Sequence, residues 1–363
     1  MKTYDWSKWV GVIAAVVAIQ LFAGGMLASA ATITYPAKVG YPNSIASTGD
    51  SITRAFNDGL IPFTDAPQYS WSTGDKNAVN SHYSRILAAN ALISGQTFND
   101  AITGEKMSGL NGEVANAISQ NAEYVTILMG ANDACTSTPG TMTPVATYRS
   151  EFETAMHTLT TGLPDSRIFV SSLPNIFNLW ATLRNNSQAD QTWTLFHICQ
   201  SMLAQPTSTS RKDMLRRAYV LKRVYDYNTQ LAQVCAEYIH CRFDNNAVFK
   251  TTFTATDINT RDYFHPSVAG QALLASTTYA ATFNFTDMTA PVSTATSTPV
   301  SGGISVALTA TDNVGVAGIE YQLGSTAWTR YTAPVLVSSS STLVYRAVDV
   351  NGNIEASHSI SAP

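Results

Sequence analysis

The sequence predicts an α/β domain with a parallel central sheet, followed by a small all-β sandwich. Continuous apolar runs at 124–129 and 167–173 have the length and composition of strands that are buried on both faces. Segments with apolar residues at helical spacing separate such runs, and this alternation is typical of a parallel sheet. Short alternating runs fill the chain after residue 303 and indicate antiparallel strands.

The elements of the α/β domain follow in order from residue 44. A first strand ends at Gly49, and Ser51 then lies in the first turn of a helix expected over 52–56. Ligands of such sheets bind at the carboxyl ends of the strands, where Ser51 and the residues after Met129 both lie. Further strands are expected at 98–102, 124–129, 167–173 and 241–243, and helices at 81–92, 110–122, 152–163, 214–238 and 268–283.

A change in composition marks the end of the first domain. The α/β domain is expected over 31–286, and the segment 287–303, rich in Thr, Ser, Pro and Gly, is interpreted as a linker. The sandwich is then expected over 304–363, with a start of its first strand near 291 as the alternative. Its strands are expected at 304–310, 316–323, 335–337 and 343–348.

The N-terminus has the residue order of a secretory signal. Lys2 and Lys8 flank the start of a charge-free apolar run at 9–27, which ends in Ala28-Ser29-Ala30. Charged, apolar and small residues in this order predict a signal peptide over 1–30, cleaved after about Ala30, and hence an extracellular protein. The alternative is an uncleaved membrane anchor, since about 18 apolar residues can span a bilayer.

The charge and the cysteines limit the classes of partner and site. The chain has 21 basic and 25 acidic residues and no basic run, so nucleic acid is not an expected partner. Four cysteines in an exported chain indicate two disulfides, for which three pairings exist. Cys235 and Cys241 are close in sequence and are expected to pair, which leaves Cys135 with Cys199. Their spacing is not that of a zinc site, and neither a metal nor a cofactor is expected.

Four short segments at strand ends or ahead of the last helix carry groups that ester hydrolysis needs. Ser51 alone fits a helix cap as well as it fits a nucleophile. The distant segments add a histidine, a carboxylate and hydrogen-bond donors. The four are Gly49-Asp50-Ser51, Asn99-x-Ala101-x-x-Gly104, Gly130-Ala131-Asn132-Asp133 and Asp262-Tyr263-Phe264-His265.

Each residue type in these segments has a chemical reason. Ser51 supplies a hydroxyl, His265 can accept its proton, and Asp262 three residues earlier can orient the imidazole. The backbone N–H groups of Ser51 and Gly104 and the side-chain amide of Asn132 can face a developing oxyanion. Glycine is expected at 104 because a residue without Cβ lets the backbone come close to the substrate.

In these four blocks, over about residues 40–285, the sequence resembles the SGNH or GDSL-type serine esterases and lipases. The resemblance implies a three-layer α/β/α fold and hydrolysis of carboxylic esters through an acyl-serine intermediate. It also implies a triad of Ser51, Asp262 and His265, with Ser51, Gly104 and Asn132 forming the oxyanion hole.

The sequence departs from the family pattern at one position and matches it loosely at another. Ile52 stands where the family name has leucine, and Gly104 is the loosest match because Gly109 and Gly112 lie nearby.

Two other histidines, His240 and His358, also follow a carboxylate by three residues. His240 is expected at a helix end and His358 in the β region, so both are interpreted as structural. The other candidates, interpreted as packing, turn or network residues, are His82, His157, His197, Asp50, Asp133, Trp71, Trp180 and Trp193.

The expected function is that of a secreted carboxylic ester hydrolase, an esterase or lipase, acting on a lipid or acylated carbohydrate. A carbohydrate esterase that deacetylates polysaccharide is one alternative, and a non-catalytic surface or adhesion protein on a hydrolase scaffold is another. The C-terminal module resembles bacterial Ig-like repeats through residues 309–313 and 345–353. It is expected to be a spacer, with contact to cell wall or polysaccharide as the alternative.

Overall fold

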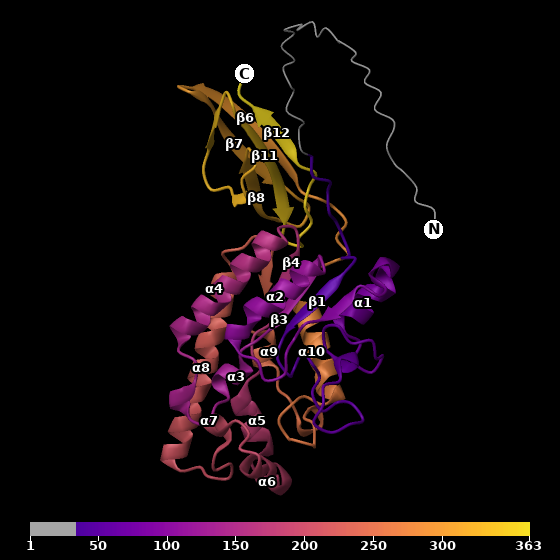
Figure 1. Ribbon diagram of the computed structural model, residues 1–363, viewed down its shortest axis with the longest axis vertical. Helices are drawn as coiled ribbons and strands as arrows, with labels where there is room; N and C mark the ends of the chain where they lie inside the picture. The colour runs from indigo at the N-terminus through magenta and orange to yellow at the C-terminus, as the bar shows by residue number, and fades with distance from the viewer. Residues whose placement is uncertain (1–33) are drawn as a thin grey trace, which may run out of the picture. The chain divides into compact units, whose positions relative to one another are not determined.

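A five-stranded parallel sheet forms the centre of the first domain (Figure 1), in the strand order β2-β1-β3-β4-β5. The computed structural model describes residues 34–363, so the predicted signal peptide and its cleavage point lie outside the described residues. No helix within 34–363 is long and apolar enough to cross a membrane. The five strands are β1 (Ile45–Gly49), β2 (Thr97–Asn99), β3 (Tyr124–Leu128), β4 (Arg167–Val170) and β5 (Cys241–Phe243).

Helices cover both faces of this sheet, which makes the three layers that the sequence predicts. On one side α2, α4 and α8 pack against one another, and α1 and α10 lie on the other side (Figure 1). Every residue of β1, β3 and β4 is buried, as expected for strands covered on both faces. The helices are α1 (His82–Ala89), α2 (Leu110–Ser119), α3 (Ala131–Ala134), α4 (Val145–Gly162), α5 (Ile176–Leu183), α6 (Ser187–Leu195), α7 (Gln200–Leu203), α8 (Arg211–Cys235), α9 (Ala247–Lys250) and α10 (Val268–Ala281), with 3-10 turns η1 (Pro67–Tyr69), η2 (Ala91–Ile93), η3 (Met107–Gly109), η4 (Pro139–Thr141) and η5 (Ala255–Asp257).

The strand order places a switch point between β1 and β3. From β1 the chain crosses to β2 on one side, and then returns to β3 on the other side of β1. Connections that leave in opposite directions open a crevice at the carboxyl ends of such strands, where ligands of these folds bind. Ser51 follows β1 and Asn132 follows β3, so both candidate residues lie at this crevice.

Residues 51–57 form consecutive turns instead of the expected helix. The N–H of Arg54 donates to the carbonyl of Asp50 (3.1 Å), and the N–H of Phe56 donates to that of Ser51 (3.0 Å). Ala55 and Asn57 have φ values of 49° and 73°, however, and a right-handed helix cannot continue through left-handed residues. The single turn still presents Ser51 at the end of β1.

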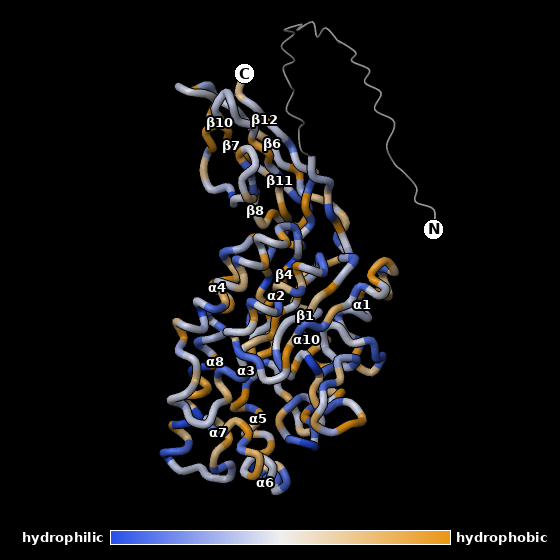
Figure 2. Tube along the Cα trace, viewed as in Figure 1, coloured by the Kyte–Doolittle hydropathy of each residue, from blue (hydrophilic) through white to orange (hydrophobic). Residues whose placement is uncertain are grey.

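Two antiparallel sheets form the C-terminal all-β module, with strand orders β10-β7-β6 and β12-β11-β8-β9. Apolar residues of both sheets, among them Val306, Val337 and Ala347, share one core. Figure 2 shows the hydrophobic stretches along its strands. The strands are β6 (Val292–Val300), β7 (Gly303–Thr311), β8 (Val316–Leu323), β9 (Thr329–Arg330), β10 (Val335–Ser338), β11 (Thr342–Asp349) and β12 (His358–Ser361).

The segment 287–303, expected as a linker, is a strand over much of its length. β6 pairs with β7 from Val292↔Thr311 to Val300↔Gly303. Its Ser, Thr and Val residues suit an edge strand, and only its first part is covered by the module, at Ser293 and Ala295, so composition alone misjudged this segment. The alternative start near residue 291 describes the module better.

Buried arginines fasten this module to the amino-terminal edge of the parallel sheet. Arg167, the first residue of β4, donates to the carbonyl of Asn351 (2.9 Å) and to Oδ1 of Asn353 (2.9 Å). Arg346 of the module, only 1% exposed, donates to Asp165 just before β4 (2.5 Å). The module therefore docks at the edge of the sheet opposite the switch-point crevice.

Candidate active site

The backbone at Gly49 and Asp50 sets the position of Ser51. Gly49 has a φ of 142°, and a Cβ there would lie 2.3 Å from the carbonyl oxygen of Leu128, so only glycine fits. Asp50 is fully buried, and its Oδ1 accepts a hydrogen bond from the N–H of Ile52 (2.9 Å). Asp50 thus closes the turn, as expected, while the adjacent Ser51 reaches a cleft.

The structure brings Ser51, His265 and Asp262 into one hydrogen-bonded chain. His265 Nε2 lies 2.8 Å from Ser51 Oγ, and His265 Nδ1 lies 2.7 Å from Asp262 Oδ2. Asp262 Oδ1 accepts from the backbone N–H groups of Phe264 (2.9 Å) and His265 (3.0 Å), so the carboxylate closes its own turn. Residues 51 and 265 come from opposite ends of the domain, yet their side chains meet at hydrogen-bond distance.

Asn57 also binds this carboxylate, and sequence reasoning missed it. Its Nδ2 donates to Asp262 Oδ2 (2.5 Å), while its Oδ1 accepts from the N–H of Phe63. The left-handed φ of 73° at Asn57 suits asparagine. No motif marks this residue, and its partner is 205 positions away, so sequence alone gives no signal for it.

The three candidate oxyanion donors face the same region. Asn132 Nδ2 donates to the carbonyl of Glu105 (2.9 Å), the residue after Gly104, and keeps a second amide hydrogen. Among the described residues, the N–H groups of Ser51 and Gly104 donate no hydrogen bond within the protein. Ser51, Gly104 and Asn132 all line one cavity. Free N–H groups beside a hydroxyl can bind a carbonyl oxygen that becomes negative.

The backbone conformation at Gly104 gives one physical reason for glycine at this position. A Cβ at Gly104 would meet no protein atom within 4 Å, so contacts within the protein do not require glycine there. Its φ of 85° is the requirement, because residues with a side chain adopt that region at a cost. Gly109 and Gly112, the other candidates by sequence, lie in η3 and α2.

A cavity of about 340 Å³ opens at these residues, and four phenylalanines are among the residues that line it. The His265 ring lies between Phe56, at 5.0 Å between ring centroids, and Phe264, at 5.1 Å. Phe63 and Phe196 face each other at 6.1 Å across the outer part of the cleft. The arrangement presents a hydroxyl and hydrogen-bond donors at the base of an apolar cleft.

The disulfide Cys135–Cys199 forms part of the cleft wall. It ties the loop after α3 to the start of α7, and so holds the segment that carries Phe196. The second disulfide, Cys235–Cys241, joins the end of α8 to the start of β5. These are the two pairs that the sequence favours.

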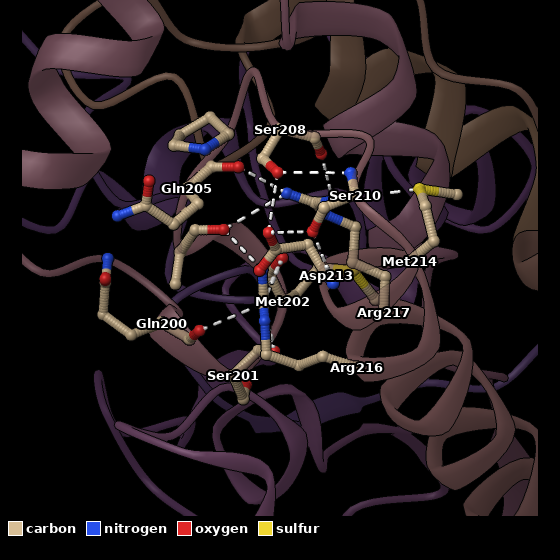
Figure 3. Close-up of polar contacts among 12 residues, drawn as sticks. Gln200, Ser201, Met202, Gln205, Ser208, Ser210, Asp213, Met214, Arg216 and Arg217 are labelled. Carbon is tan, nitrogen blue, oxygen red and sulfur yellow. Dashed lines mark hydrogen bonds and ion pairs between the residues drawn. The ribbon is translucent and has the colours of Figure 1, made fainter.

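Two arginines of α8 hold the segment that follows Cys199 in the cleft wall (Figure 3). Arg216 donates to the backbone carbonyls of Ser201 (2.7 Å) and Met202 (2.9 Å), and Arg217 donates to those of Gln205 (2.6 Å) and Ser208 (2.7 Å). Backbone carbonyls at a helix end need such donors when no further helical turn supplies them. The segment between Cys199 and α8 is thus held at both ends.

Burial and hydrogen bonding move the pKa values of the acids around Ser51 in different directions. Burial, the largest influence, acts to raise the pKa of Asp262, but hydrogen bonds from His265 and Phe264 and the charge of His265 leave it below its usual value. Burial raises the pKa of Asp50 to about 6 and that of Asp58 to about 7. Asp262 is therefore the carboxylate that stays ionised beside His265.

Glu113 lies beneath the turn that carries Ser51. It is fully buried on α2, and its Oε2 accepts from the N–H of Gly49 (2.7 Å). Burial, the largest cause, raises its pKa to about 9, and the nearby Asp50 charge adds to the rise. Glu113 is protonated at neutral pH in the folded protein.

Replacing Glu113 by glutamine is expected to flatten the pH dependence of stability. The folded protein keeps the Glu113 proton up to about pH 9, whereas the unfolded chain loses it near its ordinary value of 4.5. Between those values the free energy of unfolding falls as pH rises, by up to about 1.4 kcal/mol per pH unit. Denaturant unfolding from pH 5 to 8 should give a slope in Glu113→Gln that is less steep than the wild-type slope by up to about 1.4 kcal/mol per pH unit, while Asp50 and Asp58 keep their own contributions below about pH 6 and 7. The same change at the exposed Glu237 should keep the wild-type slope, and an unchanged slope in Glu113→Gln would contradict the assignment.

None of the residues interpreted as structural lines the cleft. His82 is buried between the hydroxyls of Tyr124 (2.9 Å) and Thr278 (2.8 Å). His240 lies 3.4 Å from Glu320 at the docked module, and His358 lies 3.3 Å from Glu355 within it. Trp71, Trp180 and Trp193 are at most 2% exposed.

Comparison with known proteins gives a family match over residues 45–277, to the model described as GDSL-like Lipase/Acylhydrolase. No curated protein sequence matches the chain significantly.

Solved structures with a similar fold share little sequence with the chain. A protein from Parabacteroides merdae assigned to the GDSL-like lipases has 16% identity and a TM-score of 0.42, over 68% of this chain and 98% of its own. An extracellular lipase from Streptomyces rimosus has 14% identity and a TM-score of 0.41, over 66% and 99%. A family 3 carbohydrate esterase from Clostridium thermocellum has 12% identity and a TM-score of 0.38, over 67% and 95%. The family match spans more than half of the chain, and with it the chain belongs to the GDSL-like lipase/acylhydrolase family.

Proposed function

We propose that this protein is an exported carboxylester hydrolase in which Ser51 forms an acyl-enzyme. The observation that carries the proposal is the chain of hydrogen bonds from Ser51 Oγ through His265 to Asp262, at 2.8 and 2.7 Å. A histidine between a hydroxyl and a carboxylate can take the hydroxyl proton while the carboxylate stabilises the imidazolium.

The first half of the reaction follows from these positions. His265 Nε2 takes the proton as Ser51 Oγ bonds to the carbonyl carbon of the ester, and the carbonyl electron pair moves to oxygen. The N–H groups of Ser51 and Gly104 and the free amide hydrogen of Asn132 donate to that oxygen. The ester C–O bond then breaks, and the alcohol leaves with the proton from Nε2.

The second half repeats these steps with water in place of serine. His265 takes a proton from water as the water oxygen bonds to the acyl carbon. The bond to Ser51 Oγ then breaks, Oγ recovers its proton from His265, and the carboxylic acid departs. Asp262 stays ionised throughout and holds the ring through Nδ1.

The apolar rim of the cleft favours esters with aliphatic or aromatic parts. Phe63 and Phe196 line the cleft and are still 56% and 57% exposed. Leu60 and Ile61, which precede Phe63 by three and two residues, and Leu195, which adjoins Phe196, are 97%, 67% and 73% exposed. Large exposed apolar side chains gathered at one mouth indicate contact with apolar ligands.

Export and the role of the β module are part of the proposal. The charged, apolar and small-residue order of 1–30 and the two disulfides support an oxidising, extracellular location. The module docks through Arg167 and Arg346 at the opposite edge of the sheet, which supports a role in stability or spacing. Contact of the module with cell wall or polysaccharide remains the alternative to a spacer.

Hydrolysis of p-nitrophenyl butyrate, compared with release of acetate from acetylated xylan, tests the proposal with the full-length protein. We expect saturable hydrolysis of the butyrate ester, and kcat/KM on acetylated xylan at least about tenfold lower than on the soluble ester. Faster release from xylan would favour the carbohydrate esterase. No hydrolysis of either substrate would favour a non-catalytic scaffold.

A further inference from the structure

A second cavity lies behind the catalytic cleft. It has a volume of about 50 Å³, and its lining is almost entirely apolar. Phe264 is the residue that lines both this cavity and the cleft at Ser51. Phe264 therefore borders both spaces.

The second cavity also lies against the loops that carry the reacting groups. Ile52 and Ala131 line it, and they are the chain neighbours of Ser51 and Asn132. The cavity is thus lined by the residue next to the proposed nucleophile, Ser51, and by the residue next to a proposed oxyanion donor, Asn132. An acyl group bound to Ser51 Oγ would start next to it.

The remaining walls suit a hydrocarbon chain. Ile176, Leu179, Phe253 and Ile258 are each at most 8% exposed and present only carbon to the cavity. The polar lining residues include Asn178, whose Oδ1 is occupied by the N–H of Phe253 (3.2 Å). Apolar cavities of this kind stay dry, and each methylene group buried in one gains about fourfold in affinity.

Hydrogen bonds fix the main chain at Phe264 and at the residue before it. The N–H of Phe264 donates to Asp262 Oδ1 (2.9 Å), and the preceding carbonyl, of Tyr263, accepts from Trp193 Nε1 (3.0 Å). The ring stands edge-on to His265 and is half-buried. Removal of this ring would join the cavities while the turn kept its hydrogen bonds.

We infer that the cavity behind Phe264 is a subsite for the acyl tail, and that the Phe264 ring limits the length of acyl chain that the enzyme accepts. The inference rests on the proposed function, since it assumes an acyl group on Ser51. It assigns selectivity for short acyl chains to one side chain beside the catalytic histidine.

Phe264→Ala, in the full-length protein, tests this assignment with p-nitrophenyl esters from acetate to dodecanoate. The ratio of kcat/KM for decanoate to that for acetate should rise at least about tenfold, mainly through a lower KM for the long chains. Phe264→Leu should give a smaller rise in the same direction, and it serves if the alanine variant does not fold. Phe177→Ala is the matched control, because Phe177 is half-buried on α5, the helix that carries Leu179, but lines neither cavity; its ratio should equal that of the wild type.

A second test fills the cavity again in the Phe264→Ala variant. Adding Leu179→Phe to Phe264→Ala places a ring in the joined space from the other side, and should return the ratio toward the wild-type value. A uniform loss of kcat at every chain length in Phe264→Ala would mean that Phe264 only supports His265, and would overturn the inference. A wild-type protein that hydrolyses none of the esters would instead overturn the proposed function.

Discussion

Replacing Ser51 by alanine is expected to lower kcat for ester hydrolysis by about 10⁵- to 10⁶-fold, with KM changed by less than about threefold. The methyl group cannot form the acyl bond, while the cleft lined by Phe56, Phe63 and Phe196 still binds the substrate. Steady-state kinetics on p-nitrophenyl butyrate with the purified full-length variant measures the loss.

Replacing His265 by alanine tests the same step, the attack by Ser51, at the proposed general base. His265→Ala should lose about as much activity as Ser51→Ala, and the double variant should lose no more, because the two residues act as one unit. His157→Ala is the control, since His157 is exposed on α4 and should keep wild-type kinetics. Additive losses in the double variant would mean that Ser51 and His265 act separately.

Asp262→Asn should lower kcat by about 10⁴-fold without unfolding the protein. Every partner of this carboxylate is a donor: the N–H groups of Phe264 and His265 at Oδ1, and Asn57 Nδ2 and His265 Nδ1 at Oδ2. An amide has only one acceptor oxygen, so its NH₂ group would face Nδ1 of His265. The imidazole would then carry its proton on Nε2, where it cannot accept the proton of Ser51.

The matched control for this variant is Asp50→Asn. Asp50 is also buried beside Ser51, but it closes a turn through the N–H of Ile52 and does not contact His265 through a hydrogen bond. We expect Asp50→Asn to stay within about tenfold of the wild type in kcat. Thermal unfolding of both variants separates a loss of chemistry from a loss of fold. Equal losses in the two variants would contradict the special role of Asp262.

The sequence predicts most of the central sheet because parallel strands carry a signal that survives without tertiary information. The runs at 124–129 and 167–173 are apolar throughout, and β3 and β4 lie within them. Reactive residues that follow such strands must meet at the carboxyl edge, so the sequence alone places Ser51 and Asn132 together. His265 and Asp262 followed from chemistry and spacing.

Features that depend on tertiary contacts were not predictable in this way. The turn at 51–57 ends because Ala55 and Asn57 adopt left-handed backbone, and the alanine gives no local signal of this. The strand β6 looked like a linker, because its small polar residues become a strand only when β7 lies beside them. Asn57 reached Asp262 through a loop whose path the local sequence does not determine.

The walls of the cleft also depend on tertiary contacts and were not predictable from the sequence. Residues 175–202 have no reactive motif, yet they form α5, α6 and the start of α7 and bring Phe196 and Cys199 to the cleft. Docking of the β module likewise depends on Arg167, a residue that sequence reasoning placed in an ordinary strand. The family was therefore predictable from the reacting groups, whereas the residues that line the cleft were not.

Covalent trapping with a serine-directed fluorophosphonate tests the central claim most directly. The probe should attach once per molecule, to Ser51 Oγ with loss of fluoride, and fragment spectra of the tryptic peptide spanning residues 39–54 should locate it. Labelling should vanish in Ser51→Ala, slow by at least about 10³-fold in His265→Ala, and be blocked by excess substrate. Equal labelling of the wild type and Ser51→Ala, or an active wild-type enzyme that the probe labels elsewhere, would contradict the account.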